Sequence, residues 1–135
     1  MNNKKLGNSF EAEFCKILQK NGIWCHRFVP SADGQPSDVI AVSHSKATLI
    51  DCKVCSAKGF ELRRMEENQS LAMSYWKSKG NGECYFACQS VDNIVMVSHT
   101  MVTKYLADEI KSISWEDMLR MCLTLNEWIA IWKQE

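Results

Sequence analysis

Two short segments combine charged side chains with neighbouring apolar runs, namely Pro36-Ser37-Asp38 and Asp51-Cys52-Lys53. Both should lie on strands, because β-branched and apolar residues follow Asp38 and precede Asp51. Side chains alternate between the faces of a strand, so Asp51 and Lys53 should point one way and Cys52 the other. If the two strands pair, two carboxylates and an ammonium group converge at one edge of a sheet. Such a cluster is suited to a hard divalent cation that promotes attack of water on a phosphate.

The hydrophobic pattern predicts the elements that position these side chains. A helix is expected over 8–21, where Phe10, Phe14 and Leu18 share one face and Asn21-Gly22 ends it. A second helix is expected at about 65–79, after a basic loop over residues 55–64. The expected strands are 23–29, 37–42, 47–54, 83–89 and 94–97, with a hairpin around residues 44–46.

This order of elements indicates an α/β (α+β) fold with a mixed central sheet of about five strands flanked by helices. A chain of 135 residues is expected to be a single domain. We expect a core over 1–99 and a helical C-terminal extension over 100–135. Trp76, Trp115, Trp128 and Trp132 occur at helical spacing, which is more typical of core residues than of base-stacking platforms.

The charge is unevenly distributed along the chain although the formal net charge is zero. Residues 1–80 hold 12 Lys and Arg against 8 Asp and Glu, whereas residues 81–135 hold 4 against 8. A basic first part is compatible with binding to DNA. No signal peptide and no apolar run of about 20 residues is evident, so no membrane association is expected. Seven cysteines without a secretory signal indicate free thiols in a reducing cytoplasm.

Ordinary structural explanations compete with these functional ones. Asp51 and Lys53 could form an exposed ion pair, although Leu49 and Ile50 favour an interior strand. Gln69 could be a surface amide and Ser31 a plain loop residue. The cysteines show C-x-x-C and C-x-x-x-C spacing, which suggests a zinc site. However, the two cysteines of the second motif would lie ~13 Å apart on one strand, so buried free thiols are expected and zinc is not.

The motifs resemble those of the PD-(D/E)xK nuclease superfamily, and within it Holliday junction resolvases of the archaeal and RecU types, including phage-encoded ones. The resemblance covers about residues 7 to 89. Pro36-Ser37-Asp38 and Asp51-Cys52-Lys53 are similar to the P-D and [DE]-x-K elements, with Ser37 inserted and Asp in place of the commoner Glu. Three further similarities are G-x-x-[FY]-E at 7–11, a basic residue and a serine within 27–31, and Gln69 on the following helix.

The resemblance implies a restriction-endonuclease-like core and a role for each matched residue. Asp38 and Asp51 would bind Mg²⁺ or Mn²⁺ together with the Cys52 backbone carbonyl. Lys53 would orient the attacking water or stabilise the transition state. Glu11, rather than Glu13, would bind a second ion or an ion-bound water, and Gln69 would position the water or the phosphate. The residues expected to contact DNA are Arg27, Ser31, Lys58, Arg63, Arg64 and Lys77.

The implied function is that of a metal-dependent DNA endonuclease, a Holliday junction resolvase that makes symmetric nicks in four-way junctions as a homodimer. Branched or double-stranded DNA is its expected partner, and the resemblance implies the cytoplasm of a bacterial or archaeal cell or of a phage-infected host. Two alternatives are another nuclease of the superfamily, of the nicking, repair or restriction type, and a catalytically inactive DNA-binding module. The complete set of Asp38, Asp51 and Lys53 argues against the inactive module. A zinc-bearing interaction protein is a more distant alternative.

Overall fold

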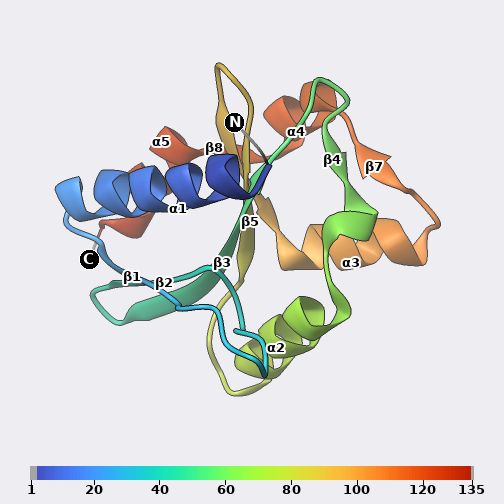
Figure 1. Cartoon of the computed structure of the whole chain (residues 1–135). Coiled ribbons are helices and arrows are strands. Elements are labelled where there is room, and N and C mark those ends of the chain that lie inside the picture. Colours follow the sequence, from blue (N-terminus) through green and yellow to red (C-terminus); the bar gives the residue numbers. More distant parts are fainter. Residues whose placement is uncertain (1–2, 135) are drawn as a thin grey trace.

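A computed structural model describes residues 3–134, and within this range it contains a six-stranded mixed sheet with the order β1-β2-β3-β5-β6-β8 (Figure 1). The strands of this sheet are β1 (Trp24–Arg27), β2 (Val39–Ser43), β3 (Lys46–Val54), β5 (Tyr85–Gln89), β6 (Ile94–Ser98) and β8 (Leu123–Thr124). A small separate sheet pairs β4 (Phe60–Glu61) with β7 (Ser112–Ile113). The helices are α1 (Asn3–Lys20), α2 (Glu67–Ser78), α3 (His99–Ala107), α4 (Trp115–Met121) and α5 (Leu125–Trp132), and a 3-10 helix spans Leu62–Arg64.

The first helix forms as its apolar spacing predicts. Phe10, Phe14 and Leu18 are all buried along the face that meets the sheet. The helix ends where Gly22 adopts a φ of +78°, a conformation that few other residues tolerate. The Asn21 side-chain amide donates to the Ile17 carbonyl and so satisfies one of the last carbonyls of the helix. α1 therefore presents a fixed face to the strands that carry the acidic motifs.

The hairpin of β2 and β3 confirms the pairing expected around residues 44–46. Val39 lies opposite Ile50 in an antiparallel register, and His44 makes the turn with a φ of +53°. The next opposed position along this register joins Asp38 and Asp51. Since directly opposed side chains share one face of an antiparallel pair, both carboxylates point to the same side of the sheet. β3 then pairs with β5 in parallel, and the crossover between them contains α2.

Helices cover the sheet on both faces and divide the core into two clusters (Figure 1). α1 and α5 pack on one face, where Phe14, Ile50 and Trp128 are buried together. α2, α3 and α4 pack on the other, where Met73, Val102 and Met118 surround Phe86. Burial of apolar surface at about 25 cal/mol per Å² is the main stabilising term for such layers. The sheet is thereby held rigidly beneath the acidic motifs.

Three short strands were not expected from the sequence. β8 adds a sixth strand to the predicted five, through pairs such as Val95 with Thr124. β4 and β7 fix the basic loop, and there Gly59 approaches so closely that an added Cβ would lie 2.1 Å from the Ile113 carbonyl oxygen. Within residues 100–134 the chain also contains strands, so this segment is not purely helical. Of the four tryptophans assigned to the core, Trp128 and Trp132 are buried in it.

No helix within residues 3–134 has both the length and the apolar character required to cross a membrane.

Candidate active site

The carboxyl groups of Asp38 and Asp51 meet at the end of the β2–β3 hairpin. The backbone N–H of Cys52 donates to Asp38 Oδ2 at 2.8 Å, which fixes the Asp38 side chain against the neighbouring strand. Asp51 is almost completely buried, with 1% of its surface exposed. The strand pairing predicted from the sequence therefore brings both acids together on one face.

Lys53 and Gln69 hold the two oxygens of Asp51. Lys53 Nζ lies 2.8 Å from Asp51 Oδ2, and its side chain is only 12% exposed. The Gln69 amide donates to Asp51 Oδ1 at 3.0 Å, and its own oxygen accepts from the backbone N–H of Glu66 at the start of α2. Oδ2 receives no well-directed hydrogen bond, so its contact with the ammonium is an ion pair without hydrogen-bond alignment.

The two neighbouring acids repel each other when both are ionised, and this repulsion adds to the effect of burial on the pKa of Asp38. Burial and the Asp51 carboxylate, which also shares a hydrogen bond with Asp38, raise the pKa of Asp38 to about 9. The Cys52 backbone N–H opposes this rise and the Glu11 carboxylate adds to it. Lys53 supplies one positive charge for two carboxylates, so full ionisation of the pair leaves an unbalanced negative charge in a partly desolvated site.

A divalent cation fits this donor set. Carboxylate oxygens suit Mg²⁺ and Mn²⁺, and a cation would remove the repulsion that keeps a proton on Asp38. Within the described residues, no group of three or more Asp, Glu, His or Cys side chains is arranged to hold a metal ion. The remaining ligands must therefore come from backbone carbonyls, water or a bound phosphate, as is usual for Mg²⁺.

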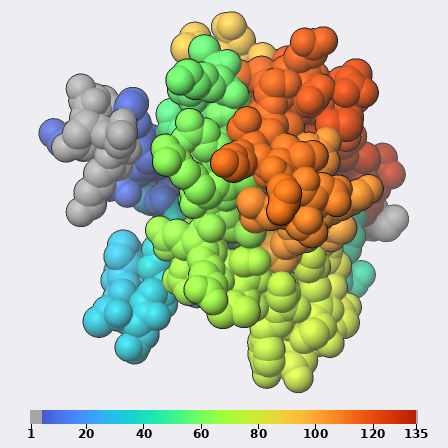
Figure 2. All heavy atoms as spheres, turned by 90° about the vertical axis from the view of Figure 1, so that its right-hand side faces the viewer, coloured from blue at the N-terminus to red at the C-terminus, as the bar shows by residue number. Residues whose placement is uncertain are grey.

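Glu11 lies beside this pair but is already engaged. Arg27 Nη2 donates to Glu11 Oε2 at 3.0 Å, which joins α1 to β1. Glu11, Arg27, Phe28 and Asp38 line one cavity of about 370 Å³ that opens beside the acids. Figure 2 shows the surrounding surface, where the loop near residues 30–36 (cyan) stands away from the body and a hollow separates it from the first helix (blue). The sequence predicted roles for Glu11 and Arg27 separately and did not anticipate that they form an ion pair.

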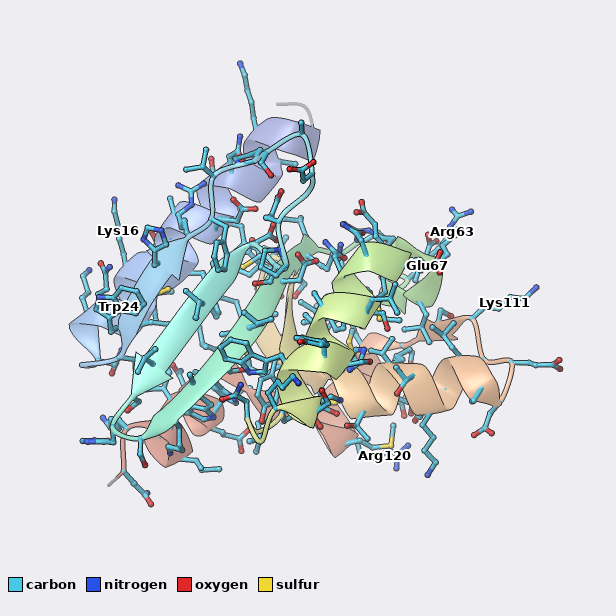
Figure 3. All side chains as sticks on the ribbon, turned by 90° about the horizontal axis from the view of Figure 1, so that it is seen from below. Lys16, Trp24, Arg63, Glu67, Lys111 and Arg120 are labelled. Atoms are coloured by element: carbon cyan, nitrogen blue, oxygen red, sulfur yellow. The ribbon has the colours of Figure 1, made fainter. Side chains whose placement is uncertain are left out.

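The residues predicted to contact DNA differ in how free their side chains are. Arg63 is highly exposed, with 85% of its side chain accessible and an ion pair to Glu61, and Figure 3 shows it pointing outward. Lys58 lies in an exposed turn of the same basic loop. Ser31 is exposed in its loop and donates to the Gly34 carbonyl.

Arg64 and Lys77 have structural partners instead. The Arg64 guanidinium donates at 2.8 Å to the carbonyl of Val54, the last residue of the strand that carries Asp51 and Lys53. Lys77 pairs with Glu83 at 3.2 Å and donates to Thr100. Arg64 thus ties the basic loop to β3, a role that its residue type alone does not distinguish from phosphate binding.

Ser37 is a positioning residue that sequence reasoning missed. It is 1% exposed, and its hydroxyl donates to the Val39 carbonyl at 2.8 Å. This contact fixes the backbone on either side of Asp38. From the sequence, Ser37 is interpreted only as an insertion in the P-D element. However, a serine next to an aspartate at the start of a strand often forms such a local hydrogen bond with the backbone.

The cysteine thiols are buried, as expected, in five of seven cases, and all seven are free in the described part of the chain. Cys52 and Cys122 are partly exposed. Burial without a charged partner favours the neutral thiol, so most of these side chains act as small apolar residues.

Comparison with known proteins identifies the family. No curated protein sequence is significantly similar to the chain. The fold is similar to that of a solved structure from Archaeoglobus fulgidus, described as Hjc, a Holliday junction resolvase from an archaeal hyperthermophile. That match has a TM-score of 0.69 and 17% sequence identity, and it covers 91% of this chain and 99% of the other. The family model for the archaeal Holliday junction resolvase (Hjc) matches residues 2–126, so the chain belongs to the family of archaeal Holliday junction resolvases, which are nucleases.

Proposed function

We propose that the chain is a divalent-metal-dependent endonuclease that resolves four-way DNA junctions by paired, symmetric nicks. The observation that carries the proposal is the meeting of Asp38 and Asp51 on one sheet face, with Lys53 in contact with Asp51. A structural ion pair would need one carboxylate, and the second makes the site electrostatically unfavourable unless a cation is bound. A carboxyl group whose pKa is strongly raised by burial and a neighbouring carboxylate is typical of functional sites.

Asp38 and Asp51 are the proposed side-chain ligands of Mg²⁺ or Mn²⁺, with the Cys52 backbone carbonyl as a further donor. When bound, the cation would supply charge neutralisation at the scissile phosphate and lower the pKa of a water molecule. Gln69 keeps the Asp51 carboxylate in place, because it donates to Oδ1 while Glu66 fixes the amide orientation. Lys53 places a positive charge at the same carboxylate, where it can also reach the reacting phosphate.

Glu11 is proposed to assist at the same edge, since it shares a cavity with Asp38. Its carboxylate would have to leave Arg27 to reach an ion or an ion-bound water. The proposed exchange releases the Arg27 guanidinium at the mouth of the cavity, where it can donate hydrogen bonds to a phosphate in place of Glu11.

DNA contacts are proposed for the exposed basic segment after β3 and for the loop before Asp38. Lys58 lies in the turn after β3, Arg63 in the 3-10 helix that follows it, and Ser31 on the loop before Asp38. These contacts would reach the backbone and carry no sequence information. Lys77 could join them only by releasing Glu83, and Arg64 only by releasing the Val54 carbonyl.

Two symmetric incisions require two active sites, so we propose a homodimer with a two-fold axis. The outer face of α2 carries Leu71 and Tyr75 at 63% and 66% exposure, beside the site. An apolar surface so placed supports contact with a second copy, which light scattering on the purified protein would test.

Cleavage of a four-way junction tests the proposal directly. The purified chain is incubated with a junction and with a linear duplex of the same sequence, in Mg²⁺, Mn²⁺ or EDTA. We expect symmetric nicks in the junction when Mg²⁺ or Mn²⁺ is present, and no cleavage in EDTA. Equal cutting of the linear duplex would indicate another nuclease of the superfamily, and tight binding without cutting in either metal would indicate an inactive binding module.

A further inference from the structure

Two buried thiols face each other where α1 packs on β1. The Sγ atoms of Cys15 and Cys25 lie 2.7 Å apart, and the two side chains are 6% and 5% exposed. They share one hydrogen bond, in which either thiol can be the donor. Neither residue has a part in the proposed cleavage reaction.

The thiol pair lies next to the ion pair that joins the same two elements. Cys15 follows Glu11 by one helical turn, and Cys25 precedes Arg27 by two residues, which places each on the same face as its neighbour. α1 and β1 are thus connected at two adjacent points, one electrostatic and one through sulfur. Within residues 3–134, β1 is an edge strand of the sheet and pairs only with β2, so these connections hold it from one side.

The two thiols differ in their chemical character. The hydrogen bond shared with Cys25 and the nearby Arg27 guanidinium lower the pKa of Cys15. The same hydrogen bond and burial raise the pKa of Cys25. Cys15 is therefore the better nucleophile, and Cys25 remains a protonated thiol beside it.

We propose that Cys15 and Cys25 form a reversible intramolecular disulfide when the protein meets a hydroperoxide. The Cys15 thiolate attacks one peroxide oxygen, the O–O bond breaks, and a sulfenic acid and hydroxide (or an alkoxide) are formed. The Cys25 sulfur then attacks the Cys15 sulfur, the S–O bond breaks, and the Cys25 proton leaves with the hydroxyl group as water. Two thiols are oxidised, one peroxide is reduced, and a dithiol reductant reverses the change.

The disulfide acts as a staple between the first helix and the edge strand. Its formation needs the sulfur atoms to approach by less than about 1 Å, so little else must move. Linking residues 15 and 25 restricts the unfolded chain and should raise the melting temperature by about 5–10 °C. The carboxyl groups of Asp38 and Asp51 keep their contacts, so junction cleavage should change less than about 2-fold.

The test uses the full chain and does not depend on its nuclease activity. The reduced protein is treated with hydrogen peroxide, its remaining thiols are alkylated under denaturing conditions, and its tryptic peptides are analysed by mass spectrometry. We expect two of the seven thiols to disappear, and peptides 6–16 and 21–27 to be joined. We also expect the melting temperature to rise and to return after dithiothreitol. Cys15→Ser and Cys25→Ser should each prevent both changes, whereas Cys122→Ser, at a partly exposed cysteine on another element, should not.

Three results from the peroxide-treated, unmutated protein would overturn the proposed disulfide. The first is that all seven thiols can still be alkylated, and the second is a link between two chains. The third is an internal link elsewhere, for example between Cys55 and Cys88, whose thiols also share a hydrogen bond. A link between residues 15 and 25 with an unchanged melting temperature would refute the stapling effect.

Discussion

Replacement of Asp38 by Asn should abolish cleavage and at the same time stabilise the metal-free protein. The Asp38 carboxyl faces the Asp51 carboxylate, and this contact together with burial raises the pKa of Asp38 to about 9. An amide has no charge to repel Asp51, can donate to it, and can still accept the N–H of Cys52 that now reaches Asp38 Oδ2 at 2.8 Å. The substitution therefore removes a cost of folding and a metal ligand together.

The magnitude of this stabilisation depends on pH with a defined sign. In the unfolded chain Asp38 ionises near its ordinary pKa of 3.8, whereas in the folded protein it keeps its proton up to about pH 9. Between these values the folded state binds more protons, so the free energy of unfolding of the wild type falls as pH rises, by up to ~1.4 kcal/mol per pH unit. Because Asp38 is only partly buried, water screens part of this effect. We expect Asp38→Asn to gain little near pH 4 and about 1–3 kcal/mol at pH 7.

Urea denaturation in EDTA, monitored by tryptophan fluorescence between pH 4 and pH 8, measures the difference. Asp33→Asn, at an exposed loop position, is the matched control and should leave stability unchanged at every pH. The reasoning is refuted if Asp38→Asn lowers the free energy of unfolding at pH 7, or if its gain is the same at pH 4 and pH 7.

Four further substitutions test catalytic, DNA-binding and structural roles. Lys53→Ala removes the ammonium 2.8 Å from Asp51 Oδ2, so single-turnover cleavage should fall ~10²-fold or more while junction affinity in gel-shift assays stays within about 3-fold; wild-type cleavage would exclude Lys53 from the mechanism. Arg64→Ala removes a charged donor from the Val54 carbonyl and should cost about 1–3 kcal/mol in urea denaturation. Arg63→Ala, at an exposed site, should cost less than about 0.5 kcal/mol and instead flatten the salt dependence of junction binding; equal costs for the two arginines would contradict these assignments. Trp128→Ala should lower the free energy of unfolding by about 3–5 kcal/mol, since the indole is 1% exposed within the core, and a loss below 1 kcal/mol would show that the residues after α4 are not integral to the domain.

The central hairpin could be predicted because its information is local. Short apolar runs and a polar turn between them define both strands, and their pairing places Asp38 opposite Asp51 without reference to the rest of the chain. The first helix is predicted for the same reason, from the spacing of residues such as Phe14 and Leu18.

Features that depend on tertiary contacts could not be predicted in this way. β8 has only two residues, too few for any periodic signal, and it forms because α4 and α5 bring Leu123 and Thr124 to the edge of β6. An arginine in a basic loop is equally suited to a phosphate or a carbonyl, and only the fold shows that Arg64 reaches Val54. The ion pair of Glu11 with Arg27 likewise joins residues that are 16 positions apart.

Direct measurement of Mn²⁺ binding by isothermal titration calorimetry tests the central claim that Asp38 and Asp51 share a divalent cation. The titration is made at pH 7 without DNA, in two buffers of different ionisation enthalpy, on the wild type and on Asp38→Asn and Asp51→Asn. Because the pKa of Asp38 is raised to about 9, the wild type should release about one proton per bound ion, and each variant should bind at least about 10-fold more weakly. Mn²⁺ binding of wild-type strength in both variants would contradict the shared site.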